Sequence, residues 1–144
     1  MKWVAFDKHS AMRCGSVQWR PFRTTHLDSL RKRFGSARPA ASFNAFSLLA
    51  TAGGKRLAYS GDIGAPTDLG PLCAKSLDLL VVELAHFQPK ELFEFLQPKI
   101  VRRVAITHLG RPARARLAEV KLLARKILGP RKTQFATDGD IVRF

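Results

Sequence analysis

The pattern of apolar and polar positions predicts a β-rich first third. Residues 17–24 alternate weakly and are rich in β-forming residues, and Pro21 makes this segment an edge or bulged strand. Residues 42–51 and 56–60 predict two strands joined by a glycine turn, as in a hairpin. The basic stretch before the first of these two strands, 31–41, contains Gly and Pro and predicts a loop.

Helical and extended patterns interleave in the rest of the chain, which predicts an α/β layer. Residues 77–84 are nearly all apolar, as in a strand buried on both faces. Residues 113–128 carry apolar side chains at helical spacing and precede a Gly-Pro pair that ends a helix. The other predicted elements are a short helix within 66–74, a helix over 89–96, a strand over 101–107, and a hairpin of 134–137 with 141–144.

Charge changes this picture, because 25 Lys and Arg residues face 11 acidic ones and give a net charge of +14. Such a surface favours polyanions, nucleic acid above all. The basic residues are scattered, as on solvated faces, so the sequence assigns no nucleic-acid-binding residue. Cys14 and Cys73 lie far apart without CxxC spacing, which argues against a four-cysteine zinc site or a disulfide framework.

The sequence shows neither a signal peptide nor a membrane span, so we expect a cytoplasmic location with no membrane partner. Charged residues at Lys2 and Asp7 interrupt the N-terminus too early for a signal peptide. We find no apolar run of about 18 residues or more, the length that a membrane span requires.

Three polar residues share one context, since His26, Asp62 and His108 each follow an extended apolar segment. In α/β sheets the carboxyl ends of strands are where ligands and catalytic groups gather. Imidazole and carboxylate together suit zinc, iron or manganese. A single histidine at a strand end is also common as a hydrogen-bonded structural residue. Thr107 precedes His108 and is placed to orient its ring.

Five segments, in order, carry a resemblance to a known family: TTHLD, SFNAFSLLATAGGKRLAYSGDIG, DLLVVELAHF, VAITHLG and FATDGDIVRF. This order resembles the second half of the metallo-β-lactamase superfamily, in its ribonuclease Z-like phosphodiesterase branch. The resemblance covers about residues 16–144. It implies an α/β fold, the C-terminal half of an αββα sandwich with a mixed sheet and flanking helices. We therefore expect residues 1–144 to form a single partial domain, whose uncovered sheet face would favour association.

The resemblance also implies roles for individual residues. His26 matches a histidine that binds the first metal, Asp62 the aspartate that bridges two metals, and His108 a histidine that binds the second. Glu83 matches a glutamate implicated in proton transfer, which makes it a catalytic candidate beside Asp62. His86 is a candidate for contacting the metal ligands and supporting their orientation without binding the metal itself. For Glu83 and His86, an ordinary polar strand end or loop remains an equal alternative.

The family's H-x-H-x-D-H motif is absent, and Asp7-Lys8-His9 does not replace it. Four of the seven ligand positions expected from the resemblance therefore have no match in these 144 residues. A catalytic zinc normally has three protein ligands and a water molecule. We expect the ligand set to be incomplete and the chain alone to be poorly active.

The resemblance implies a metal-dependent hydrolase that acts on a phosphodiester through a metal-activated hydroxide. Lactones, thioesters and β-lactams stay open as substrates, because the fold does not select among them. The implied cofactors are two divalent metal ions, zinc first, with iron or manganese as alternatives. The implied partner is a missing N-terminal half or a second copy of the chain. The alternative is a non-catalytic basic module that binds nucleic acid or another protein.

Overall fold

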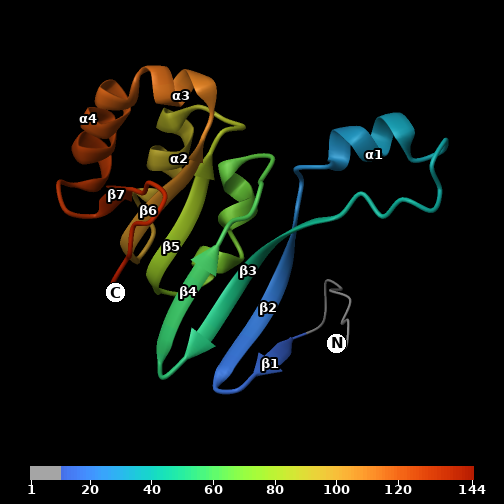
Figure 1. Cartoon of the computed structure of the whole chain (residues 1–144), viewed down its shortest axis with the longest axis horizontal. Coiled ribbons are helices and arrows are strands. Elements are labelled where there is room, and N and C mark those ends of the chain that lie inside the picture. Colours follow the sequence, from blue (N-terminus) through green and yellow to red (C-terminus); the bar gives the residue numbers. More distant parts are fainter. Residues whose placement is uncertain (1–10) are drawn as a thin grey trace.

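A computed structural model describes residues 11–144, so His9 and the charged N-terminus lie outside the described residues. The strands are β1 (Met12–Cys14), β2 (Val17–Thr24), β3 (Ala45–Ala52), β4 (Lys55–Tyr59), β5 (Leu77–Leu84), β6 (Val101–Leu109) and β7 (Thr133–Phe135). The helices are α1 (Asp28–Phe34), α2 (Pro89–Leu96), α3 (Arg111–Ala115) and α4 (Leu117–Leu128), with short 3-10 turns η1 (Pro66–Leu69) and η2 (Leu72–Ala74) (Figure 1). Within the described part, no helix is both long and apolar enough to cross a bilayer.

The strands form one mixed seven-stranded sheet in sequence order. Neighbours from β1 to β4 are antiparallel, and neighbours from β4 to β7 are parallel. The predicted hairpin of β3 and β4 is present, with Leu48 opposite Tyr59. β1 pairs with β2 only as far as Trp19, so among the described residues Pro21 has no partner strand on that side. This position accommodates a residue without an N–H group.

One face of the sheet forms the core with helices α2 and α4, which lie side by side (Figure 1). Alternate residues of the central strands point to this face, and Leu80, Val82 and Ile106 are fully buried there. Leu92 and Leu96 cover them from α2, which a reciprocal capping box of Gln88 and Glu91 starts. The predicted α/β class with flanking helices is therefore confirmed.

The opposite face of the sheet is only partly covered. Leu48, Leu57 and Val81 are half-buried on it, and Tyr59 is 46% exposed. The C-terminal segment crosses part of this face, where the guanidinium of Arg103 donates to the backbone carbonyl of Arg143 over 3.0 Å. Leu79 and Ala105 are nevertheless buried on this face, so its exposed apolar surface lies mainly around Tyr59.

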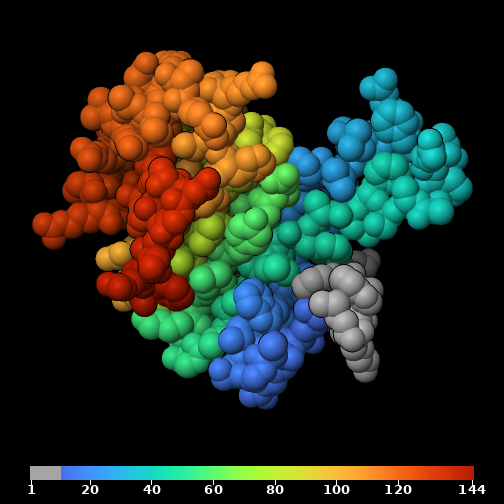
Figure 2. Space-filling model, viewed as in Figure 1, coloured from blue at the N-terminus to red at the C-terminus, as the bar shows by residue number. Residues whose placement is uncertain are grey.

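Two helical regions differ from the prediction. α1 forms where a loop was expected from residue 31 onward, with Asp28 in its first turn and three basic residues in its last, both favourable for the helix dipole. None of its residues is buried, and it projects from the body with the following segment (Figure 2). The helix predicted over 113–128 is two helices, because the backbone leaves helical geometry at Arg116.

The predicted C-terminal hairpin is wrong. Only Thr133–Phe135 is a strand, and it pairs with β6 in parallel. Phe135 packs against the core, which fixes β7 beside β6. The Asp140 carboxylate accepts the N–H of Thr137 over 2.9 Å, so the expected turn forms, but no strand follows it.

The two cysteines differ in environment, since Cys14 is exposed and Cys73 is buried. Burial raises the pKa of the Cys73 thiol, despite the opposing effect of Lys99 and Lys132. Because the thiolate is the nucleophile, we expect iodoacetamide to modify Cys14 in the folded chain and Cys73 only in urea. Intact-mass spectrometry would measure this difference, and equal labelling rates in the folded protein would contradict it.

Candidate metal centre

Strand direction brings the candidate residues to one edge of the sheet. β2 and β4 are both antiparallel to β3, so they run in the same direction as β5 and β6. His26 follows β2, Asp62 follows β4, His86 follows β5, and His108 lies at the end of β6. Their side chains therefore gather where the carboxyl ends of these strands meet.

The Asp62 carboxylate lies between two imidazoles. Its Oδ1 is 3.0 Å from Nδ1 of His108, and its Oδ2 is 3.9 Å from Nε2 of His26. The two oxygens therefore face different histidines, which is the arrangement that a bridging carboxylate needs. The side chains are 23% exposed for His26, 45% for Asp62 and 55% for His108, so the centre is open to solvent on one side.

His86 joins this group from the loop after β5. Its ring centre is 4.5 Å from that of His26 and 5.7 Å from that of His108. Its Nδ1 contacts the Glu83 carboxylate at 2.7 Å. Glu83 is only 2% exposed and also accepts the backbone N–H groups of Ile63 and Ala85, at 2.7 and 3.0 Å. Glu83 thus fixes both the loop that carries Asp62 and the ring of His86.

Thr107 precedes His108 on β6, and its role in orienting the His108 ring stays a prediction. It lies opposite Glu83 in the pairing of β5 with β6. No hydrogen bond joins it to His108 in the part of the chain that the structure covers. His108 itself has a positive φ of 43°, which is rare for a residue with a side chain. With this backbone conformation, Nδ1 of the ring lies 3.0 Å from Oδ1 of Asp62.

Asp68, which the sequence analysis did not single out, holds the two loops of the centre together. Its Oδ2 accepts the N–H of Thr25 at 3.0 Å and the N–H of Gly64 at 2.9 Å. Thr25 precedes His26, and Gly64 follows the Asp62 loop. The only sequence signal was an acidic residue shortly after the Ser-Gly-Asp turn, which does not by itself indicate a contact with Thr25.

Gly61 makes the turn that presents Asp62. Its φ is +56°, and a Cβ on it would lie 2.8 Å from the carbonyl oxygen of Phe46. The backbone carbonyl of Asp62 accepts a hydrogen bond from the Thr24 hydroxyl over 3.0 Å, which fixes the backbone at Asp62. A side chain at Gly61 would therefore clash with β3 and displace the carboxylate.

We expect Gly61→Ala to destabilise the protein by about 2 kcal/mol, because left-handed backbone alone costs about 1–2 kcal/mol for a residue with a Cβ. Urea unfolding followed by circular dichroism would measure the loss. Gly53→Ala is the control, because Gly53 has a similar φ of +54° but open space around the position of a Cβ. An equal loss in both variants would show that the contact with Phe46 adds nothing.

A cleft of about 500 Å³ opens beside the centre. Its lining includes His26, His86 and Gly64 from the centre, and Ser29 and Leu30 from α1. A molecule in this cleft would touch both the imidazoles and the base of the α1 segment.

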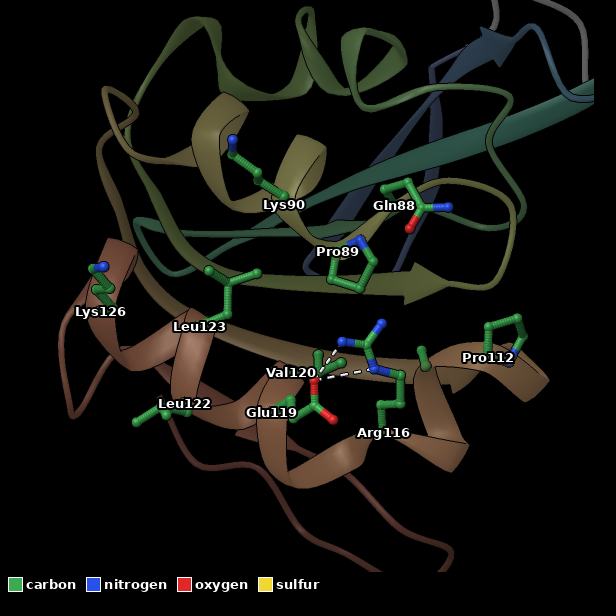
Figure 3. A pocket seen from close by; sticks show the side chains of 11 residues that line it. Gln88, Pro89, Lys90, Pro112, Arg116, Glu119, Val120, Leu122, Leu123 and Lys126 are labelled. Atoms are coloured by element: carbon green, nitrogen blue, oxygen red, sulfur yellow. Dashed lines mark hydrogen bonds and ion pairs between the residues drawn. The ribbon is translucent and has the colours of Figure 1, made fainter.

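A second hollow lies away from the chemistry, in the helical layer (Figure 3). It has a volume of about 480 Å³ and lies between the start of α2 and helices α3 and α4. Apolar side chains such as Val120 and Leu123 line it, and Arg116 is ion-paired with Glu119 at its edge. None of the candidate residues lines this hollow, so it is separate from the candidate metal centre at the strand ends.

The donor set suits a divalent metal. One ligand atom from each of His26, Asp62 and His86 lies within 4.8 Å of the others, and the same holds for Asp62, Glu83 and His108. Ligating histidines almost always give their second ring nitrogen to a carboxylate or carbonyl, as His86 does with Glu83. The structure therefore brings together His26, Asp62, Glu83, His86 and His108, and their role as metal-binding or catalytic residues stays a prediction.

Comparison with solved structures shows that the chain has the metallo-β-lactamase fold. The solved structure of YhfI from Bacillus subtilis, a metallo-β-lactamase fold protein, matches with a TM-score of 0.72 at 15% identity, over 96% of this chain and 54% of that one. Isothiocyanate hydrolase from Delia radicum gut bacteria matches with a TM-score of 0.67 at 12% identity, over 98% and 59% of the two chains.

A variant of the β-hydroxylase CmlA matches as well, with a TM-score of 0.60 at 11% identity, over 92% of this chain and 32% of that one. The sequence matches no protein-family model, and no match to a curated protein was found. The chain spans little more than half the length of YhfI and of the isothiocyanate hydrolase. The names of these proteins include a hydrolase and a hydroxylase, so the shared fold does not select a reaction.

Proposed function

We propose that this chain supplies the C-terminal half of a metal-dependent hydrolase centre that acts on phosphodiesters. One observation carries the proposal: the Asp62 carboxylate directs its two oxygens toward two different histidines, His26 and His108, at the carboxyl edge of the sheet. Divalent ions bound there would supply an activated water nucleophile and stabilise the charge that develops on the substrate. Zinc is our first choice, with iron or manganese as alternatives.

Each residue has a separate task in this proposal. Asp62 would hold the ions through its carboxylate, and His26 and His108 would each contribute a ring nitrogen. Glu83 is buried and hydrogen-bonded, so it orients the His86 ring and accepts or returns a proton at Nδ1 of that ring. Asp68 keeps the His26 and Asp62 loops at a fixed separation.

Charge beside the cleft supports a phosphodiester substrate. The exposed residues Arg31, Lys32 and Arg33 lie on α1, whose first turn lines the cleft. The chain as a whole carries +14. Cationic side chains next to a hydrolytic centre attract the phosphate backbone of a nucleic acid.

The centre requires more ligands than these 144 residues offer, because two ions would share Asp62 and would have one further ligand each, His26 or His108. We propose that additional polypeptide carrying H-x-H-x-D-H, either a further segment of the same protein or a partner chain, completes it. The apolar face around Leu48, Leu57 and Tyr59 is the surface on which a second layer would rest. The positive charge makes a second copy of this chain the less favourable partner.

Hydrolysis of bis(p-nitrophenyl) phosphate with added zinc or manganese tests the proposal. The chain alone should be nearly inactive, and activity should appear when it is co-purified with a polypeptide of the same cell that binds it and carries H-x-H-x-D-H. A complex that binds zinc but leaves phosphodiesters intact, while hydrolysing a lactone or thioester, would overturn the substrate class. A complex without any metal-dependent hydrolysis would overturn the proposed function.

One observation favours the alternative of a non-catalytic nucleic-acid-binding module. Residues 111–132, which include α3 and α4, contain eight basic residues and one acidic residue, Glu119. Binding to a fluorescent RNA across a salt series separates the two functions. A steep salt dependence that chelators do not change supports the module, whereas binding that requires zinc and involves His26 supports the hydrolase.

A further inference from the structure

From the geometry around His86, we propose that these 144 residues by themselves hold one divalent metal ion, with His26, Asp62 and His86 as its three ligands. The inference deepens the proposed function, since it concerns the same centre, but it does not require hydrolysis. It gives His86 a direct role in place of the supporting one that the sequence indicates.

The three ligand atoms are close enough to surround one ion. They lie within 4.8 Å of one another, and Nε2 of His26 is 3.9 Å from Oδ2 of Asp62. Zinc binds imidazole nitrogen and carboxylate oxygen at about 2.0–2.2 Å, so two ligand atoms on one ion lie about 3–4 Å apart. Small rotations of the side chains would bring all three to this distance.

His86 is already oriented as a ligand. Its Nδ1 contacts Glu83 at 2.7 Å, so Nε2 is the nitrogen that remains to bind an ion. Glu83 is itself fixed by the N–H groups of Ile63 and Ala85. A buried carboxylate behind an imidazole fixes its tautomer and raises its basicity, as in carboxylate–histidine–zinc arrangements.

The other group of close donors is less suited to an ion. It contains Asp62, Glu83 and His108. Both oxygens of Glu83 are occupied, by backbone N–H groups and by His86, and the residue is 2% exposed. Recruiting Glu83 would leave buried N–H groups without acceptors, which costs about 1–3 kcal/mol for each group.

Two imidazoles, a carboxylate and an open position match the usual catalytic zinc site, which has three protein ligands and a water molecule. The open position would face the cleft of about 500 Å³, since His26 and His86 both line it. His108 would remain beside Asp62, available to bind a second ion when further ligands are present. The centre would thus fill in order, with this chain alone binding the first ion.

Zinc titration of the metal-free 144-residue chain tests the inference, with calorimetry for stoichiometry and imidazole ¹⁵N NMR for ligand identity. We expect one zinc ion per chain, with the nitrogen signals of His26 and His86 shifting together at the first equivalent. His86→Ala should weaken binding by more than about 100-fold, since changes behind a ligand already cost about 10–100-fold. His108→Ala should weaken it less, and urea unfolding of both metal-free variants should show that each is folded.

The outcomes separate this inference from the proposed function. If the first equivalent shifts His26 and His108 while His86 stays unchanged, His86 is not a ligand, although the hydrolase proposal stands. If the chain alone binds no zinc, the inference is overturned, and the completed complex still tests the hydrolase. Glu83→Gln alone should weaken zinc binding, whereas adding Glu83→Gln to His86→Ala should weaken it no further. This result would show that Glu83 acts through His86.

Discussion

Replacing Asp62 by asparagine should reduce zinc affinity by at least about 100-fold, more than changes outside the ligand sphere, which cost about 10–100-fold. Among residues 11–144, Asp62 is the only carboxylate paired with both His26 and His108, so its loss removes a ligand from each ion of the proposed centre. Phosphodiester hydrolysis by the completed enzyme should fall at least as far. Calorimetry on the chain alone and steady-state rates on the complex would measure the two effects.

The fold should survive this change. The side chain of Asp62 is 45% exposed, and it is the backbone carbonyl of Asp62, not the carboxylate, that accepts the hydroxyl of Thr24. Asp78→Asn is the matched control, because Asp78 lies near the opposite end of β5 and interacts with Lys55 and Arg102. Equal zinc affinity in Asp62→Asn and Asp78→Asn would remove Asp62 from the metal centre and with it the basis of the proposed function.

Glu83→Ala should destabilise the protein by about 3 kcal/mol, because it leaves two backbone donors without an acceptor and each such buried group costs about 1–3 kcal/mol. The N–H groups of Ile63 and Ala85 would lose their acceptor in the interior, and His86 would lose its anchor. The effect belongs to the fold as well as to the centre, so it should appear without metal. Urea denaturation of the metal-free protein would measure it.

Glu119→Ala provides a comparison for this prediction. Glu119 is also paired with a cation, Arg116, but its side chain is 63% exposed. An exposed ion pair contributes little, so the unfolding midpoint should scarcely change. If Glu83→Ala were as stable as Glu119→Ala, the buried carboxylate would not be holding the Asp62 and His86 loops.

The central elements of the fold could be predicted because their sequence patterns are local. Residues 77–84 are apolar apart from Asp78 and Glu83 and form β5, and Pro89, Leu92 and Leu96 have the spacing of a capped helix with one buried face. The C-terminal hairpin could not be predicted correctly, because Phe135 is drawn to a core made by distant residues. The polar turn after it looks the same whether a strand follows or not.

The centre was predictable to the same degree. His26, Asp62 and His108 were marked by their places after strands, and strand direction brings them to one edge. The closeness of His86 to His26 depends on how the loop after β5 turns back, and the clamp of Asp68 joins residues 43 apart in sequence. Such contacts depend on the complete folded sheet, and the spacing of residues in the sequence does not predict them. α1 was missed since none of its residues is buried, although Leu27, Leu30 and Phe34 have helical spacing.

The left-handed backbone of His108 has a consequence for engineering this protein. A left-handed conformation costs about 1–2 kcal/mol for a residue with a side chain, so glycine at this position would relieve that cost while removing an imidazole. Selection for heat resistance alone would therefore favour replacing His108. A library screened only for soluble expression would accumulate variants that lack this imidazole. Any thermostabilised version should be chosen under a simultaneous demand for metal retention.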